Sequence, residues 1–240
     1  MVMVWRVYKY ITHLFYTRHR KGHRIHSPYL FEFVNKVLFN SRGTEVPEAV
    51  LKEHRKLDSA YAFVRRSSVS RKYGKLLYRI AEWFQPEMII ELGTGMGVST
   101  LYLSSGSPGT PLHSIEGDRE RAALAAQLIV RCFPGPVSIH WGEMDEKLED
   151  ILPLIPPRFM AFVDGNHHYE PTLAYVRKLL ERAGEEAVIV MDDIYWSRGM
   201  QRAWKEVCSW PEVQVSIDLF HMGILLLRKD LHKTEIKVKF

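Results

Sequence analysis

Residues 91–97 form a pattern that suits the binding of a small charged ligand. A short apolar run leads into Glu91, and a turn follows that contains Gly93, Gly95 and Gly97. Glycines at such a turn let the backbone approach a ligand closely, and the helix that follows offers free N–H groups at its start. A glycine-rich turn alone is a weak signal, because nicotinamide and flavin enzymes share it. A tight turn without any ligand is the other interpretation.

The acidic residue in this pattern distinguishes between ligands. A carboxylate at Glu91 would repel a pyrophosphate group and attract an ammonium group. S-adenosylmethionine carries an α-amino group and a positively charged sulfonium, and it has no phosphate. Glu116 ends the next apolar run, where an acid can accept hydrogen bonds from ribose hydroxyls. Both acids therefore fit an adenosyl ligand, and Glu91 argues against a dinucleotide.

The segment from Glu91 to Gly97 resembles motif I of the class I S-adenosylmethionine-dependent methyltransferases, E-x-G-x-G-x-G, and Ser114–Asp118 resembles their second motif. The likeness extends from about Ser67 to Arg228. Within that superfamily the chain resembles the metal-dependent O-methyltransferases of the catechol and macrolide-sugar type. The cofactor-binding residues that the resemblance implies are Ser68, Val69, Glu91, Gly93, Gly95, Gly97, Glu116, Gly142, Glu143, Met144 and Asp164.

Two of these groups lie away from motif I. Ser68 and Val69 resemble the segment that the similar enzymes fold over the methionine end of the cofactor. Gly142, Glu143 and Met144 follow the third apolar run, at the place where those enzymes line the adenine. We therefore expect S-adenosylmethionine to bind across all of these segments.

Three aspartates follow two apolar runs that we expect to be neighbouring strands. Asp164 follows the fourth run, and Asp192 and Asp193 follow the fifth. The carboxyl ends of neighbouring parallel strands adjoin at one edge of the sheet. Three carboxylates repel one another unless a cation neutralises them, and oxygen ligands suit Mg²⁺. The similar enzymes hold a divalent cation with acids at these positions, so we expect a magnesium site here. Alternatively, Asp192 and Asp193 cap a loop and Asp164 only lines the cofactor site.

A base for the reaction is expected next to the first of these acids. Methyl transfer to an oxygen is an in-line displacement, and the hydroxyl must lose its proton. His167 lies three residues after Asp164, where the similar enzymes place a lysine or histidine base. Histidine titrates near neutral pH and suits this role. We expect His167 and Asp164 to be catalytic. His168 is the less favoured base, and a loop histidine that bonds the backbone is the structural alternative.

Aromatic residues follow the acid pair. Tyr195 and Trp196 come directly after Asp193, where a loop can wall an acceptor pocket and suit a planar substrate. Packing of Trp196 against the last helix is an equal alternative. Trp204 and Trp210 are expected in the core.

Short apolar runs that alternate with helical patterns must position these residues. Such alternation predicts a parallel sheet with helices on both faces. The expected strands are Met88–Glu91, Leu112–Glu116, Val137–Trp141, Phe159–Asp164, Ala187–Asp192, Val213–Phe220 and Gly223–Arg228. The short turn between the last two forces an antiparallel pair, and Ile236–Phe240 can add a final strand. We therefore expect an α/β, Rossmann-like doubly wound fold with a mostly parallel seven-stranded sheet and an antiparallel C-terminal hairpin.

Helical patterns cover much of the remaining sequence. The expected helices are Val4–Tyr16, Ser27–Phe39, Pro47–Leu57, Ser70–Phe84, Val98–Ser104, Arg119–Cys132, Asp145–Ile151, Pro171–Ala183 and Met200–Trp210. The domain prediction is an N-terminal helical extension over residues 1–66 and an S-adenosylmethionine-binding domain over residues 67–240.

Composition excludes several classes of protein. The chain has 240 residues, of which 46% are hydrophobic and 25% charged, which excludes disordered, collagen-like and coiled-coil proteins. No stretch approaches the roughly 20 apolar residues of a membrane span, and the N-terminus lacks a signal-peptide pattern. Cys132 and Cys208 follow no metal-binding spacing. A cytoplasmic location with reduced thiols is expected.

The net charge of +5 comes from the N-terminal arm. Residues 1–30 contain six basic residues and no acid, which leaves 27 basic and 28 acidic residues in the rest of the chain, a net of −1. A nearly neutral body argues against a nucleic-acid surface. The arm also contains Trp5, Tyr8 and Phe15, as interfacial helices do. Membrane-surface contact, coverage of its own domain and a homodimer contact are all compatible with it.

The leading interpretation is an S-adenosylmethionine-dependent O-methyltransferase that acts, with Mg²⁺, on a small molecule carrying a hydroxyl group. An RNA methyltransferase is a second interpretation, favoured by the basic arm. Against it, the chain has no Asn-Pro-Pro-Tyr-type amine-binding motif after the fourth apolar run. It also has no motif cysteine placed for attack on a pyrimidine. A third interpretation is a non-catalytic S-adenosylmethionine-binding or membrane-surface module.

Overall fold

The structure, a computed structural model, describes residues 2–17, 25–39, 46–60, 68–132 and 135–240. The chain divides into two units: unit 1 contains residues 1–42 and 161–240, and unit 2 contains residues 43–160. The expected domain boundary at residues 66 and 67 and the basic segment 18–24 lie outside the described residues.

The described residues contain eight strands. They are β1 (Met88–Leu92), β2 (Leu112–Glu116), β3 (Val137–Trp141), β4 (Phe159–Val163), β5 (Val188–Met191), β6 (Val215–Asp218), β7 (Gly223–Leu226) and β8 (Thr234–Lys237). Their order in the sheet is β3-β2-β1-β4-β5-β7-β6-β8. The predicted α/β fold with an antiparallel C-terminal hairpin is confirmed, with eight strands in place of seven. The additional strand is β8, which runs parallel to β6 and begins two residues before the expected segment 236–240.

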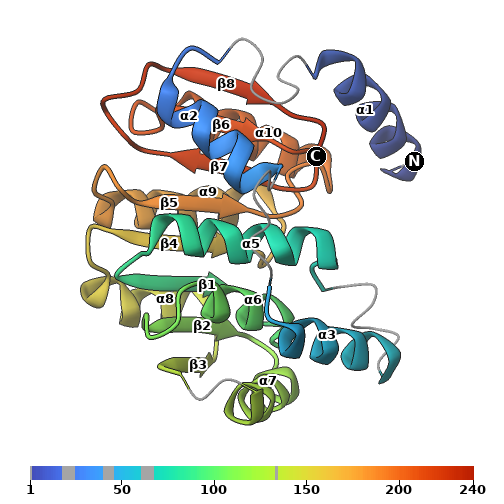
Figure 1. The fold of residues 1–240 in the computed structure, drawn as a ribbon, viewed down its shortest axis with the longest axis vertical. Coiled ribbons are helices and arrows are strands. Elements are labelled where there is room, and N and C mark those ends of the chain that lie inside the picture. Colours follow the sequence, from blue (N-terminus) through green and yellow to red (C-terminus); the bar gives the residue numbers. More distant parts are fainter. Residues whose placement is uncertain (1, 18–24, 40–45, 61–67, 133–134) are drawn as a thin grey trace. The chain divides into compact units, whose positions relative to one another are not determined.

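Helices occupy the expected segments with small shifts of their ends. They are α1 (Val2–Tyr16), α2 (Pro28–Phe33), α3 (Glu48–Ala60), α5 (Arg71–Phe84), α6 (Val98–Gly106), α7 (Arg119–Cys132), α8 (Met144–Ile151), α9 (Tyr169–Arg182) and α10 (Arg198–Ser209), labelled in Figure 1. Ser27 caps α2, as its hydroxyl accepts from the backbone N–H of Leu30. The expected single helix to Phe39 changes at Val34–Leu38 into a π-helix. A short 3₁₀ turn, Leu152–Leu154, follows α8.

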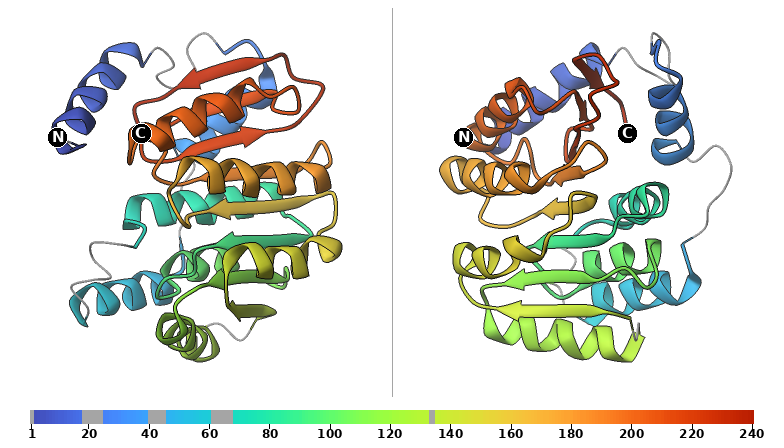
Figure 2. Two further views of the ribbon diagram at one scale, coloured as in Figure 1. Left: turned by 180° about the vertical axis from the view of Figure 1, so that it is seen from behind. Right: turned by 90° about the vertical axis from the view of Figure 1, so that its left-hand side faces the viewer.

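In unit 2 the three strands β1, β2 and β3 are parallel. Ile89 pairs with Leu112, and Leu112 pairs with Val137. Ile89 and Leu112 are fully buried. β-branched and other large apolar side chains suit these positions because the sheet is covered on both faces. Figure 2 shows this covering: α5 and α6 lie on one face of these strands, and α8 lies on the other.

In unit 1 the strand β7 is antiparallel to both of its neighbours. Met191 of β5 and Asp218 of β6 both pair with Gly223 at the start of β7. Helix α2 covers one face of these strands and α9 and α10 the other, as Figures 1 and 2 show. Trp204 of α10 is buried against Gly223, where a Cβ would overlap the indole ring. The expectation that Trp204 belongs to the core is confirmed.

Helix α1 packs by one side against the rest of unit 1. His13 is buried, and its Nε2 lies 3.2 Å from the carbonyl oxygen of Val238. Tyr10 contacts Phe220 edge to face, with 5.0 Å between ring centroids. The exposed large apolar residues of this helix are Val7, Tyr8, Tyr10, Ile11 and Phe15. Across the described residues, no helix combines the length and the apolar character needed to cross a membrane.

A stability prediction follows from the crossing of α5 and α6 in unit 2. A Cβ at Gly74 would lie 2.7 Å from Cζ of the buried Tyr102, whose hydroxyl lies 2.9 Å from Nδ1 of His54 on α3. Gly74→Ala should therefore lower the free energy of unfolding by about 1–3 kcal/mol through overpacking. Urea denaturation measures this change. The neighbouring exposed Lys75→Ala is the control, and equal midpoints for the two variants would contradict the packing account.

Candidate active site

The glycine-rich turn between β1 and α6 has the conformation that its sequence predicted. Gly97 precedes α6 with φ +80°, and a Cβ there would lie 3.3 Å from Ala125 and Leu128 of α7. Gly95 has φ +54°, and a Cβ there would meet no heavy atom within 4 Å. The left-handed conformation favours glycine at both positions. The backbone at Gly95 therefore borders open space that a ligand can enter.

Glu116 holds this turn in place. Its Oε2 accepts a hydrogen bond of 2.8 Å from the backbone N–H of Gly95, and its Oε1 accepts one of 2.9 Å from Asp118. The backbone N–H of Gly142 donates to the carbonyl oxygen of Glu116 at 3.1 Å. The structure thus brings together three segments that the sequence assigned to the cofactor. Each carboxylate oxygen of Glu116 keeps a lone pair for a further donor.

Glu91 is the next-to-last residue of β1 and is fully buried. Its Oε2 accepts hydrogen bonds from Thr100 at 2.6 Å and Ser114 at 2.5 Å. Its Oε1 has no hydrogen-bond partner among the described residues. Burial raises the pKa of Glu91 to about 7, although the hydrogen bonds lower it in part. The sequence predicts Glu91 in the ligand crevice; in the structure one of its carboxylate oxygens is bonded to two hydroxyl groups and the other is left for a further donor.

The remaining predicted cofactor residues of unit 2 lie at the starts of two helices. Ser68 is half-buried and Val69 buried just before α5. Glu143 is exposed at the N-cap of α8, and Met144 is its first residue. Asp164 lies in unit 1, directly after β4.

The ends of β4 and β5 adjoin in unit 1, as predicted. The backbone N–H of Asp192 donates to the carbonyl oxygen of Val163 at 2.9 Å. Burial and the adjacent charge of Asp193 raise the pKa of Asp192 to about 7, while a hydrogen bond with Asp164 lowers it in part. Asp164 and Asp192 therefore share one site, where negative charge is costly.

Asp193 is directed toward a different partner. It has φ +50°, and its Oδ1 lies 3.7 Å from Nη2 of Arg6 on α1. No group of three or more histidine, cysteine, aspartate or glutamate side chains in the described part of the chain is arranged to hold a metal ion. The chemistry of the three aspartates fits a divalent cation, and their arrangement in this structure does not assemble such a group.

His167 lies beside Asp164, as its spacing predicted. Its Nε2 is 3.6 Å from Oδ1 of Asp164, and its ring is 6.4 Å from that of Trp196. Burial lowers the pKa of His167, whereas the charge of Asp193 raises it to a smaller extent. The neutral imidazole, the form that can accept a proton, is thereby favoured. His168 is exposed, and its Nδ1 lies 2.9 Å from Oδ1 of Asn166.

The two aromatic residues after the acid pair have different environments. Tyr195 is buried, stacks on Phe220 with ring centroids 4.9 Å apart and donates to Asp218 at 2.9 Å. Trp196 is 47% exposed beside His167. Of this pair, only Trp196 is available to wall an acceptor pocket.

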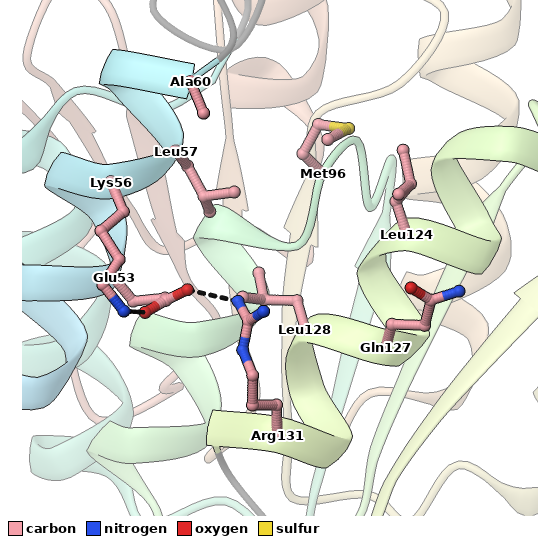
Figure 3. Close-up of a pocket in the computed structure, with 9 residues that line it drawn as sticks. All are labelled: Glu53, Lys56, Leu57, Ala60, Met96, Leu124, Gln127, Leu128 and Arg131. Atoms are coloured by element: carbon pink, nitrogen blue, oxygen red, sulfur yellow. Dashed lines mark hydrogen bonds and ion pairs between the residues drawn. The ribbon is translucent and has the colours of Figure 1, made fainter.

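Sequence reasoning did not find a cavity of about 320 Å³ in unit 2. Helices α3 and α7 and the glycine-rich turn line it with Glu53, Lys56, Leu57, Ala60, Met96, Leu124, Gln127, Leu128 and Arg131 (Figure 3). Glu53 pairs there with Lys56 at 2.8 Å and with Arg131. Met96 lines it from the glycine-rich turn, and neither Glu91 nor Glu116 is among its lining residues.

The raised pKa of Glu91 predicts a pH effect on stability. In the unfolded chain the carboxyl titrates near its ordinary pKa of 4.5, and in the folded protein near 7. The folded state therefore binds more protons between these values, and the stability that Glu91 contributes is lost as pH rises through this window. Relative to Glu91→Gln, the wild type should lose on the order of 3 kcal/mol between about pH 4.5 and 7. Denaturant titrations across this range measure the difference, and parallel curves for the two proteins would contradict it.

Comparisons with known proteins agree with this geometry. A family model described as a methyltransferase domain matches residues 90–194. The chain is 31% identical over 172 residues to a catechol O-methyltransferase from Niastella koreensis, covering 69% of this chain and 74% of that protein. An O-methyltransferase from Bacillus cereus in complex with SAH superposes with TM-score 0.63 at 20% identity, covering 80% of this chain and 97% of that one. TomG from Streptomyces achromogenes, an O-methyltransferase involved in tomaymycin synthesis and solved with SAM, gives TM-score 0.59 at 24% identity, covering 81% and 96%. The chain therefore belongs to the class I S-adenosylmethionine-dependent methyltransferases, as an O-methyltransferase.

Proposed function

We propose that this enzyme methylates a hydroxyl group of a small molecule and that His167 takes the hydroxyl proton. The observation that carries the proposal is the position of His167 between Asp164, at 3.6 Å, and the exposed ring of Trp196. A half-buried, neutral imidazole next to an aromatic surface can accept a proton from a hydroxyl held against that surface. The catechol O-methyltransferase from Niastella koreensis supports an aromatic diol as the first acceptor to test.

The cofactor is proposed to bind at the glycine-rich turn of unit 2. The open space at Gly95 gives its backbone room to contact a ligand, and Glu116 keeps lone pairs for ribose hydroxyls. Oε1 of Glu91 is a buried acceptor that an ammonium group would satisfy. Because the side chain of Glu91 is fully buried, the α-amino group of the cofactor would reach it through the open space at Gly95. Ser68, Val69 and Gly142–Met144 complete the proposed site.

The reaction is a displacement at carbon. The acceptor oxygen forms a bond to the methyl carbon, and the carbon–sulfur bond of the sulfonium breaks with its electron pair passing to sulfur. The hydroxyl proton passes to His167, and Asp164 stabilises the imidazolium that results. Trp196 excludes water and orients a planar acceptor on its exposed face.

Divalent-metal assistance is a further part of the proposal. The raised pKa of Asp192 supports it, because this carboxyl group lies next to Asp164 and Asp193 in a site that a cation would stabilise. Asp164, Asp192 and Asp193 would hold the ion. When bound, such an ion lowers the pKa of a hydroxyl and fixes its position. The relatives do not favour an RNA methyltransferase or a non-catalytic module.

The role of His167 can be tested with catechol as acceptor. His167→Ala should lower kcat by roughly 10²–10⁴-fold, the usual contribution of a general base. The wild-type rate should rise with pH through a pKa below the ordinary 6.5 of histidine, because burial lowers that of His167. In the variant this step should vanish and activity should partly recover at high pH, where the hydroxyl ionises unaided.

The neighbouring His168→Ala is the control and should retain wild-type kcat. Affinity for S-adenosylmethionine, measured by calorimetry, should stay within about twofold in both variants, because neither residue belongs to the proposed cofactor site. An unchanged pH–rate profile in His167→Ala would remove His167 as the base. Failure of the wild type to methylate any small alcohol or phenol would overturn the acceptor class.

The metal has its own test. Calorimetry should detect Mg²⁺ binding to the wild type, weakened at least about tenfold in Asp192→Asn, because the substitution removes one charged oxygen ligand. Chelation should lower turnover, and added Mg²⁺ should restore it. Asp145→Asn, an exposed acid on α8, is the control and should bind Mg²⁺ as the wild type does. Full activity in chelator would refute metal assistance while leaving the role of His167 intact.

A further inference from the structure

Helix α1 reaches the residues after β5 through Arg6. Its guanidinium lies 3.7 Å from Oδ1 of Asp193, and its Cζ lies 4.5 Å from the centroid of the Trp196 ring. Both partners belong to segment 192–196, and Trp196 is in turn 6.4 Å from the ring of His167. One side chain of the N-terminal helix therefore contacts both an acid and the aromatic wall next to the proposed base.

A second anchor fixes the same helix to the same segment. The buried His13 has its Nδ1 3.4 Å from Oδ1 of Asp218, and Asp218 accepts the hydroxyl hydrogen bond of Tyr195. Arg6 thus holds segment 192–196 at Asp193 and Trp196, and His13 holds it through Asp218 at Tyr195. The two anchors are seven residues apart on one face of α1.

The identity of the residue at position 6 matters for this contact. Arginine combines a permanent charge with a planar group that stacks on an indole ring, whereas lysine offers only a compact charge. Asp193 also has φ +50°, a left-handed conformation that is costly for a residue with a side chain. A contact that holds both Asp193 and Trp196 therefore stabilises a local backbone that the segment alone would not favour.

We propose that Arg6 is a positioning residue of the acceptor site, and that helix α1 therefore contributes to acceptor binding. Arg6 fixes the Trp196 ring from one side, which leaves the other face of the ring for the acceptor, and it keeps Asp193 in its strained conformation. The inference rests on the proposed function, because it assigns the acceptor to Trp196 and His167.

Hydrogen exchange on the full-length protein tests whether Arg6 holds the segment. The amide of Ile194 donates to His221, and that of Trp196 donates to Asp193 at 2.7 Å. In Arg6→Met both amides should exchange about threefold to thirtyfold faster, the range expected for loss of a cation–π contact. Arg6→Lys should recover part of this protection because it keeps the charge. Lys9→Met removes a neighbouring cation that faces Trp5 on the same helix and should change nothing.

Kinetics with catechol and a panel of small phenols tests whether the held segment is the acceptor site. Arg6→Met should raise KM for the acceptor by a similar factor and leave the Kd for S-adenosylmethionine unchanged, with partial rescue in Arg6→Lys. Unchanged exchange in Arg6→Met would overturn the holding role. Faster exchange with an unchanged acceptor KM would overturn the acceptor role and make Arg6 merely structural. A wild type that methylates nothing in the panel would overturn the proposed function itself, whatever the exchange rates.

Discussion

Carboxylate charge held away from water at the ends of strands is the constraint on which the site residues of both units depend. Asp192 directly follows β5 and Glu91 is the next-to-last residue of β1, and burial raises the pKa of each to about 7. An isolated buried carboxylate is costly, so the groups around it must donate hydrogen bonds, supply positive charge or leave it protonated. The contacts around both residues supply hydrogen bonds or positive charge, or leave the carboxyl group protonated.

The two units respond in different ways. In unit 2 neutral donors surround the acids: Thr100 and Ser114 donate to Glu91, and the backbone at Gly95 donates to Glu116. Such short, directed bonds fix the glycine-rich turn before any ligand arrives. In unit 1 the partner of Asp193 is the guanidinium of Arg6, which lies on a separate helix. A contact between half-exposed charges can exchange with another cation at small cost, so the acid cluster of unit 1 can adapt to what binds there.

Local pattern predicted the parts of the fold that depend on local physics. Short apolar runs predicted the strands, and the glycines at positions 95 and 97 adopt the positive φ angles for which glycine is suited. The adjoining ends of β4 and β5 followed from the alternation of strands and helices. The partners of Asp193 and Tyr195 were not predicted from local pattern, because Arg6 and Asp218 are distant in sequence and no periodicity links them. The hydrogen-bond donors to Glu91 were likewise not predicted, because these hydroxyl groups come from α6 and β2.

The balance at His167 shows how the two kinds of charge partner affect the chemistry. Burial lowers the pKa of this imidazole, and the negative charge of Asp193 raises it. A cation paired with Asp193 offsets that charge at His167, because opposite charges close together present a weaker field than either one alone. Arg6 is such a cation, and it also stacks on Trp196 next to the same imidazole. In the function proposed above, the side chain of Arg6 therefore contacts both the acid whose charge acts on His167 and the aromatic ring beside it.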